Sequence, residues 1–226
     1  MSEQKVIAAA GIGGAVLLLI GQLLVINAPT IDSPPAEIRS WAVDHRTAAL
    51  TAIYLLVLGF AVQVIFWVGL WRELRSGDGV AGLTANAGLA AAIVLTAILA
   101  GGFVFTAMLD FRASQLSDEM ARSLNDLTFV SVNLSGIVTA LTLAPFAAAI
   151  LVGRRLPTWM GWFALAIAAV HLIAGGSFAH AGFFSPQGIG VYVAPPLYYV
   201  WIIAASVILL RRGEVAVPRA LGALTG

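Results

Sequence analysis

The chain alternates between long uncharged tracts and short polar segments. Six tracts of 20 to 27 residues contain no Asp, Glu, Lys or Arg, at 7–28, 47–71, 83–109, 127–152, 158–179 and 191–210. About 20 apolar residues in a helix span the hydrocarbon core of a bilayer. The tracts lack the two-residue alternation of barrel strands, the other structure that satisfies the backbone in lipid. The pattern predicts an all-α fold: one domain, residues 1–226, with six transmembrane helices.

The first tract invites comparison with a secretory signal peptide. The residues before it, MSEQK, carry little positive charge. The tract is longer than the 7–15 apolar residues typical of a signal, and Ile26-Asn27-Ala28 fits a small-x-small cleavage site poorly. We therefore expect this tract to remain as the first membrane helix.

Charge on the connecting segments predicts the orientation. Eight of the twelve basic residues fall on one side of the predicted membrane: Lys5, Arg72, Arg75, Arg154, Arg155, Arg211, Arg212 and Arg219. The other side holds four arginines and seven of the eleven acidic residues. The positive-inside rule places the basic side in the cytoplasm. We expect a multi-pass protein of the cell (inner) membrane with both termini cytoplasmic.

The outer connections predict short amphipathic helices. Ser33 followed by Pro34 and Pro35 is typical of a helix start, and Ile38, Trp41, His45 and Ala49 then fall on one helical face. A helix on the outer surface leading into the second span is expected, with an interfacial anchor as its simplest role.

In the second outer connection, Ser117 is a candidate N-cap followed by the acidic Asp118 and Glu119. Asp110 and Arg112 lie where the third span leaves the membrane and are expected to form an interfacial ion pair.

The fourth tract carries a stripe of hydroxyl side chains within an arc of about 80° at 100° per residue. Its members are Thr128, Ser131, Ser135, Thr139 and Thr142. Such a stripe either packs against other helices or lines a polar cavity. Pro145 is expected to kink this helix. The third tract is rich in small residues, including Gly88-x3-Ala92 and Ala97-x3-Gly101, and is also expected to pack closely.

Two of the three histidines lie in HLIAGGSFAH, nine residues apart. In an unbroken helix the side chains of His171 and His180 point in opposite directions, so they do not form one site. His171 shares a helical side with Ala164, Ala168 and Gly175, so we expect it to face the bundle, neutral and bonded to a hydroxyl or carbonyl of a neighbouring helix.

His180 lies at the same predicted depth as His45 and Asp110, near the outer ends of the spans. Imidazole and carboxylate together serve as an acid–base pair or as metal ligands. These three residues are the candidate catalytic site. Because no metal-ligand spacing occurs within a helix, satisfied polar residues are the alternative, and no metal is predicted.

Composition excludes several functions. The chain is 60% hydrophobic and 10% charged, against about a quarter charged in soluble domains. It contains no cysteine, which excludes thiolate catalysis and cysteine-ligated cofactors. The six tracts contain no charge, which argues against a proton pump or a voltage sensor, and they contain no lysine for a retinal Schiff base.

Three segments carry a resemblance to a known group of proteins: NAPTIDSPPAEIRSWAVDHR after the first tract, WRELR after the second, and LPTWMGW at the start of the fifth. Together the pattern resembles uncharacterised six-helix integral membrane proteins of bacteria, of an actinobacterial type, classed as a domain of unknown function. The resemblance implies the six-helix fold and supplies no activity or catalytic residue.

The leading hypothesis is a non-catalytic membrane protein whose helix bundle binds a lipid, an apolar small molecule or a membrane partner, such as a second copy of the chain. Neither a cofactor nor a nucleic-acid partner is expected. The candidate ligand-binding residues are Ser131, Ser135, Thr139, Thr142 and His171. The alternative is an enzyme acting on a lipid or isoprenoid at His45, Asp110 and His180. A small-solute transporter and a b-haem carrier that uses His45 and His180 are lesser alternatives.

Overall fold

The computed structural model describes residues 2–75, 79–179, 184–185 and 189–222. Helices account for most of this part of the chain. Their bounds are α1 Glu3–Leu24, α2 Pro35–Asp44, α3 Arg46–Leu74, α4 Val80–Arg112, a 3-10 turn η1 Ala113–Gln115, α5 Asp118–Gly153, α6 Thr158–Gly175 and α7 Ile189–Gly222.

Six of these helices are long and apolar enough to span a membrane, namely α1, α3, α4, α5, α6 and α7. The predicted all-α, six-helix membrane bundle is confirmed. At 1.5 Å per residue, α4 and α5 are each roughly 50 Å long, well beyond the roughly 30 Å of hydrocarbon in a bilayer. These two helices therefore extend past the membrane unless they are strongly tilted.

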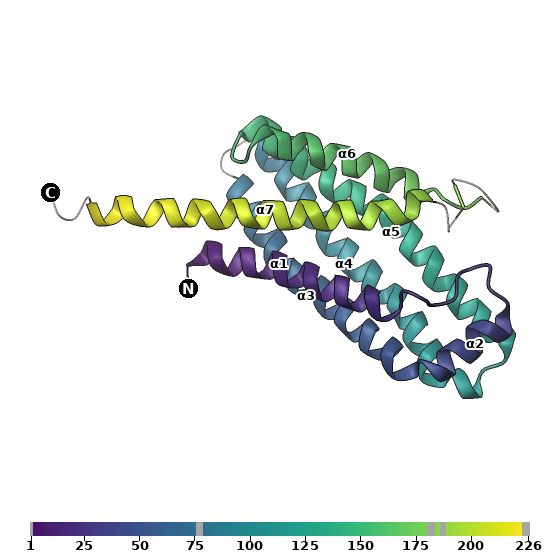
Figure 1. Cartoon of the computed structure of the whole chain (residues 1–226). Helices are drawn as coiled ribbons and strands as arrows, with labels where there is room; N and C mark the ends of the chain where they lie inside the picture. Colours follow the sequence, from purple (N-terminus) through teal and green to yellow (C-terminus); the bar gives the residue numbers. More distant parts are fainter. Residues whose placement is uncertain (1, 76–78, 180–183, 186–188, 223–226) are drawn as a thin grey trace.

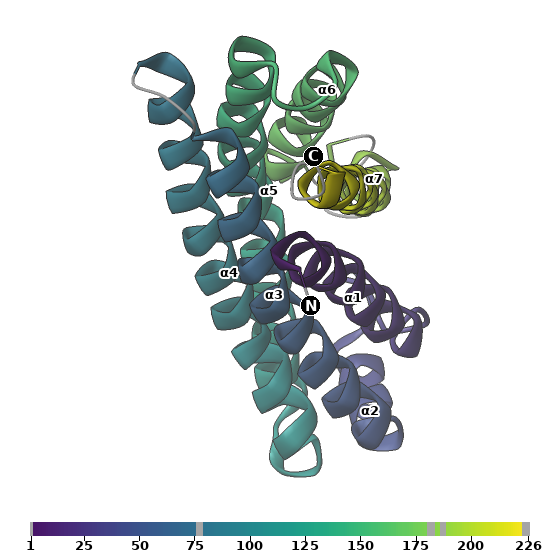
Figure 2. The same ribbon diagram turned by 90° about the vertical axis from the view of Figure 1, so that its left-hand side faces the viewer.

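The spanning helices form a closed ring in chain order. Each packs against the spans before and after it, and α7 returns to pack against α1. Figure 2 shows α7 almost end-on between α1 and α6. Because α1 packs against both α3 and α7, it is part of the bundle, as expected for the first tract.

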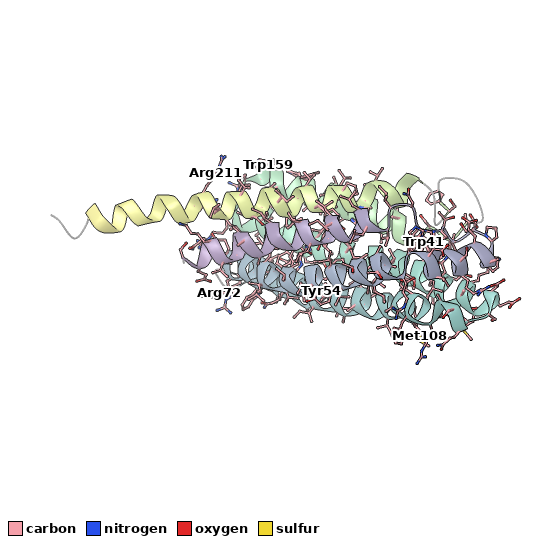
Figure 3. All side chains as sticks on the ribbon, turned by 60° about the horizontal axis from the view of Figure 1, so that its bottom comes forward. Trp41, Tyr54, Arg72, Met108, Trp159 and Arg211 are labelled. Carbon is pink, nitrogen blue, oxygen red and sulfur yellow. The ribbon has the colours of Figure 1, made fainter. Side chains whose placement is uncertain are left out.

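The start of α1 and the end of α7 lie at the same end of the bundle (Figure 1), which we call the terminal end; the opposite end is the distal end. Arg72, Trp159 and Arg211 lie toward the terminal end, whereas Trp41 and Met108 lie toward the distal end (Figure 3). This arrangement agrees with an even number of spans. The cytoplasmic location of the terminal end stays a prediction from the charge pattern.

Glycines bring neighbouring helices into backbone contact. A Cβ atom on Gly14 of α1 would lie 3.0 Å from the carbonyl oxygen of Gly59 in α3, and a Cβ on Gly59 would lie 3.0 Å from that of Gly14. A Cβ on Gly136 of α5 would lie 2.7 Å from the carbonyl oxygen of His171 in α6. In lipid, where apolar burial does not drive helices together, such close approach supplies the packing energy.

The two small-residue motifs of α4 lie in different environments. Gly88 and Ala92 are buried, and a Cβ on Gly88 would lie 2.8 Å from the Phe146 ring of α5. Ala97 and Gly101 are exposed, and a Cβ on Gly101 would meet no atom within 4 Å. The prediction of close packing is confirmed for the first motif and wrong for the second, which lies on the outer face of the bundle.

The distal end carries a second, smaller apolar core. Ile38 and Ala42 of α2 are buried with Leu109, Ala113 and Ala121, at the tip of the α4–α5 hairpin. Arg39 of α2 also forms an ion pair with Asp118 of α5. The short helix predicted after Ser33 is confirmed, but it packs on the hairpin and is more than a surface anchor.

The second outer connection is shorter than the charge pattern suggests. α4 continues to Arg112, and α5 begins at Asp118, where Ser117 Oγ accepts a 3.2 Å hydrogen bond from the Met120 N–H. The predicted N-cap is confirmed. Pro145 lies inside α5 without ending it.

The break between α2 and α3 corrects one expectation. α2 ends at Asp44 and α3 begins at Arg46, so Ile38 and Ala49 belong to different helices. Trp41 and His45 do stack on each other, with ring centroids 4.8 Å apart. The single face predicted through Ala49 is wrong because His45 separates the two helices.

Candidate functional site

The interior of the bundle toward the terminal end is filled by aromatic side chains. Trp67 of α3 stacks on Phe146 of α5 at 5.3 Å and on Trp201 of α7 at 6.1 Å, and it meets Phe66 edge-on at 5.1 Å. All four side chains are at most 1% exposed. The Trp201 indole donates a 3.0 Å hydrogen bond to the carbonyl oxygen of Met160 in α6. We call Phe66, Trp67, Phe146 and Trp201 the aromatic plug.

The interior changes character on the distal side of the plug. On this side, four helices carry buried polar residues among their apolar ones: Gln63 in α3, Thr142, Thr139, Ser135 and Asn133 in α5, His171 in α6 and Tyr198 in α7. Ser206, buried beside Gly11, is a polar exception in the terminal half of the described interior. The bundle thus joins an apolar terminal half to a partly polar distal half.

Three of these residues converge from three helices. The Tyr198 hydroxyl donates a 2.9 Å hydrogen bond to Oε1 of Gln63, and the Tyr198 ring meets the His171 ring edge-on with centroids 6.1 Å apart. Gln63 is 1%, Tyr198 5% and His171 8% exposed. We call these residues the polar cluster.

Two nitrogen atoms of the polar cluster lack partners. Nε2 of Gln63 and Nε2 of His171 are buried and have no hydrogen-bond partner among the described residues. His171 also lies close enough to the backbone of Ala194 in α7 to form a hydrogen bond through its other ring nitrogen, Nδ1. A buried polar atom without a partner is costly, so each of these two nitrogens favours the presence of a further polar group.

The predicted burial of His171 against a neighbouring helix is confirmed by its low exposure and by its edge-on contact with the Tyr198 ring of α7. Gln63 and Tyr198 are not among the residues that the sequence pattern predicted for a site. Gln63 had a detectable signal, because it is the sole Asn or Gln in the tract 47–71. A lone amide in the middle of a membrane helix is expected to seek a partner in the bundle.

The hydroxyl stripe of α5 is used for packing. Ser131, Ser135, Thr139 and Thr142 each donate to a backbone carbonyl of their own helix, three or four residues earlier, at 2.6–2.9 Å. Thr128 meets Thr106 of α4 at 2.9 Å between hydroxyl oxygens, and a Cβ on Gly102 would lie 2.8 Å from Ser131 Cβ. These contacts favour the packing interpretation over a polar cavity.

The candidate catalytic residues of the distal end lie in different environments. His45 is exposed, with Nδ1 3.1 Å from the carbonyl oxygen of Trp41 in its own turn. Asp110 is 1% exposed, and its Oδ2 has no hydrogen-bond partner among the described residues. His180 lies outside the described residues. Hydrogen bonds and ion pairs within the described chain do not join His45 to Asp110.

The expected Asp110–Arg112 ion pair is wrong. Arg112 Nη1 donates a 2.9 Å hydrogen bond to Gln115 Oε1, and its guanidinium lies over the Phe111 ring. The two side chains diverge because residues two positions apart on a helix point about 200° from each other. Within the described part of the chain, no three His, Asp or Glu side chains gather as a metal site would require.

Comparison with known proteins does not assign the chain to a family. No protein-family model matches the chain, and neither a curated protein nor a solved structure does. The fold and its interior define a multi-pass helical membrane protein with an apolar terminal half and a partly polar distal half.

Proposed function

We propose that the protein is a non-catalytic membrane-embedded binding protein that takes up the hydroxyl end of a largely apolar molecule, such as a lipid or isoprenoid alcohol. The polar cluster, Gln63, His171 and Tyr198, is the proposed binding site. The observation that carries the proposal is the pair of unpartnered buried nitrogens beside Tyr198.

The chemistry of the two nitrogens selects a hydroxyl group. Nε2 of Gln63 is a donor and needs an acceptor. When Nδ1 of neutral His171 donates to the backbone of Ala194, Nε2 is an acceptor and needs a donor. One hydroxyl group supplies both, since its oxygen accepts from Gln63 while its hydrogen is donated to His171.

The aromatic plug favours binding over passage. A solute path through the bundle would have to cross the stack of Trp67 on Phe146 and Trp201, all fully buried. A solute cannot pass through an interior packed in this way unless the side chains rearrange. The distal half is therefore the side from which a ligand reaches the polar cluster, and the apolar chain of that ligand remains among the helices or in lipid.

Solvent extraction of the detergent-purified protein, followed by mass spectrometry, tests the proposal. The expected result is a hydroxyl-bearing apolar molecule at about one per chain. In Gln63→Leu the affinity should fall about fivefold, as expected for loss of one hydrogen bond worth about 1 kcal/mol, and the occupancy should fall clearly below that of wild type.

The chain offers a matched control. Gln22 of α1 donates a 2.8 Å hydrogen bond to Tyr199 of α7, so it repeats the Gln–Tyr pairing of Gln63 with its amide nitrogen already bonded. Gln22→Leu should leave the occupancy unchanged. Wild-type protein with no such molecule, or an equal loss in both variants, would overturn the proposal.

A further inference from the structure

A second feature lies at the distal end, on the outer face of α3 and α4. Arg46, the first residue of α3, and Arg112, the last residue of α4, both lie over the ring of Phe111. Their guanidinium carbons are 5.2 Å and 5.1 Å from the ring centroid. The two cations therefore lie within about 10 Å of each other, since both are measured to the same point.

The ion pairs of the described residues set these two arginines apart. Arg39 pairs with Asp118, and Arg122 lies 4.0 Å from Asp126, so the other two arginines of the distal end each have an acidic partner. Arg46 and Arg112 take part in none of the ion pairs formed between described residues. Both guanidinium groups are exposed and have no carboxylate partner; Arg112 donates from Nη1 to Gln115, and its other N–H groups remain available for an anion.

The surface below the arginines is apolar. Val104, Met108 and Phe111 lie on one face of α4 and are 61%, 46% and 54% exposed. Gly101 continues this face toward the middle of the span, with open space where a side chain would be. The exposed apolar column ends at Phe111, and the charged Arg112 follows at once, as at a membrane–water interface.

We propose that Arg46 and Arg112 bind the phosphate of an anionic phospholipid whose acyl chain lies along Val104 and Met108 of α4. Charge complementarity identifies the headgroup: the site presents two unpaired cations, and guanidinium groups bind phosphate oxygens in bidentate fashion. The apolar column identifies the source of the phosphate as a lipid, because a free phosphate ion gains nothing from it. This site is separate from the polar cluster inside the bundle and does not depend on it.

Native mass spectrometry of the full chain tests the site, with equimolar dioleoyl-phosphatidylglycerol and dioleoyl-phosphatidylcholine added to the detergent-solubilised protein. Wild-type protein should retain phosphatidylglycerol in preference to phosphatidylcholine. Arg46→Gln and Arg112→Gln should each lower the ratio of the two bound lipids about fivefold, because one basic residue at a membrane surface contributes about 1 kcal/mol.

Arg122→Gln is the matched control, since it removes an exposed arginine of the same end that already has an acidic partner. It should leave the lipid ratio unchanged, and all three variants should melt like wild type. The proposal would be overturned if wild type showed no preference for phosphatidylglycerol, or if all three variants lost that preference equally. It would also be overturned if millimolar inorganic phosphate displaced phosphatidylglycerol.

Discussion

The hydroxyl of Tyr198 in α7 donates a 2.9 Å hydrogen bond to Oε1 of Gln63 in α3, in the middle of a membrane bundle. The bond joins two helices that are not consecutive in the ring, and it leaves Nε2 of Gln63 without a partner among the described residues. The nearby pair of Gln22 and Tyr199 satisfies its amide nitrogen instead. The difference between these two pairs is the basis of the proposed binding site.

Adjacent glycines in α1 provide a test of the helix packing. Gly14→Ala should destabilise the protein by about 1–3 kcal/mol, because the new Cβ would meet Gln63 at 2.6 Å and the Gly59 carbonyl oxygen at 3.0 Å. Denaturant unfolding in detergent micelles measures the effect.

Gly13→Ala is the control for this change. Its Cβ would meet no atom within 4 Å, so the substitution should stabilise the helix by roughly 0.5–1 kcal/mol through the better helix propensity of alanine. Effects of the same sign in both variants would contradict the packing of α1 on α3.

The aromatic plug predicts a large effect at Trp67. Trp67→Ala should lower the free energy of unfolding by about 3–5 kcal/mol, because it leaves a cavity between Phe146 and Trp201. Trp162→Ala should cost much less, since Trp162 is 64% exposed. Thermal melts of the two purified variants make the comparison, and similar melting temperatures would show that the plug is not packed as described.

The charge pattern predicts that both ends of the chain face the cytoplasm. Epitope tags added before residue 1 and after residue 226 should react with antibody only after the cells are permeabilised. Labelling of both tags on intact cells would reverse the orientation and place the distal end, with Arg46 and Arg112, on the cytoplasmic side, and labelling of only one tag would contradict an even number of spans.

The fold was predictable because each membrane helix corresponds to a long uncharged tract, and such a tract can be recognised locally in the sequence. The uncharged tracts located all six spans, and Ser117 located the start of α5. The extension of α4 to Arg112 was not predictable from charge, since Asp110 lies within it. Asp110 is buried there beside Leu109, which packs with α2 and the hairpin tip, and no local pattern encodes that tertiary contact.

The polar cluster was only partly predictable. The small residues around His171 indicated that it faces the bundle, which the structure confirms. Its neighbours could not be predicted, because they depend on the order of helices in the ring. Gln63 and Tyr198 are 135 residues apart in sequence and meet only because α7 returns beside α1. Periodicity places a residue on a face without showing which helix covers that face.

Substitutions of His171 distinguish the contributions of its two ring nitrogens to ligand binding. Asparagine places a polar group near Nδ1 only, so His171→Asn should keep the contact with Ala194 and weaken ligand binding about fivefold through loss of the Nε2 hydrogen bond, which lowers the occupancy. His171→Gln, which reaches toward the Nε2 position, should retain more ligand. His171→Leu loses both and should also lower the melting temperature. Equal occupancy in the asparagine and glutamine variants would show that Nε2 does not contact the ligand.

Side-chain amide NMR of the protein labelled with ¹⁵N-glutamine tests the central claim most directly. The chain has five glutamines, so the side-chain NH₂ signals of Gln63 and Gln22 can each be assigned from the corresponding leucine variant. Removing the bound molecule by detergent exchange should shift the Gln63 signals, because its Nε2 loses an acceptor, and should leave the Gln22 signals in place, because Gln22 keeps its bond to Tyr199. Unchanged Gln63 signals, or equal shifts at both glutamines, would contradict a ligand at the polar cluster.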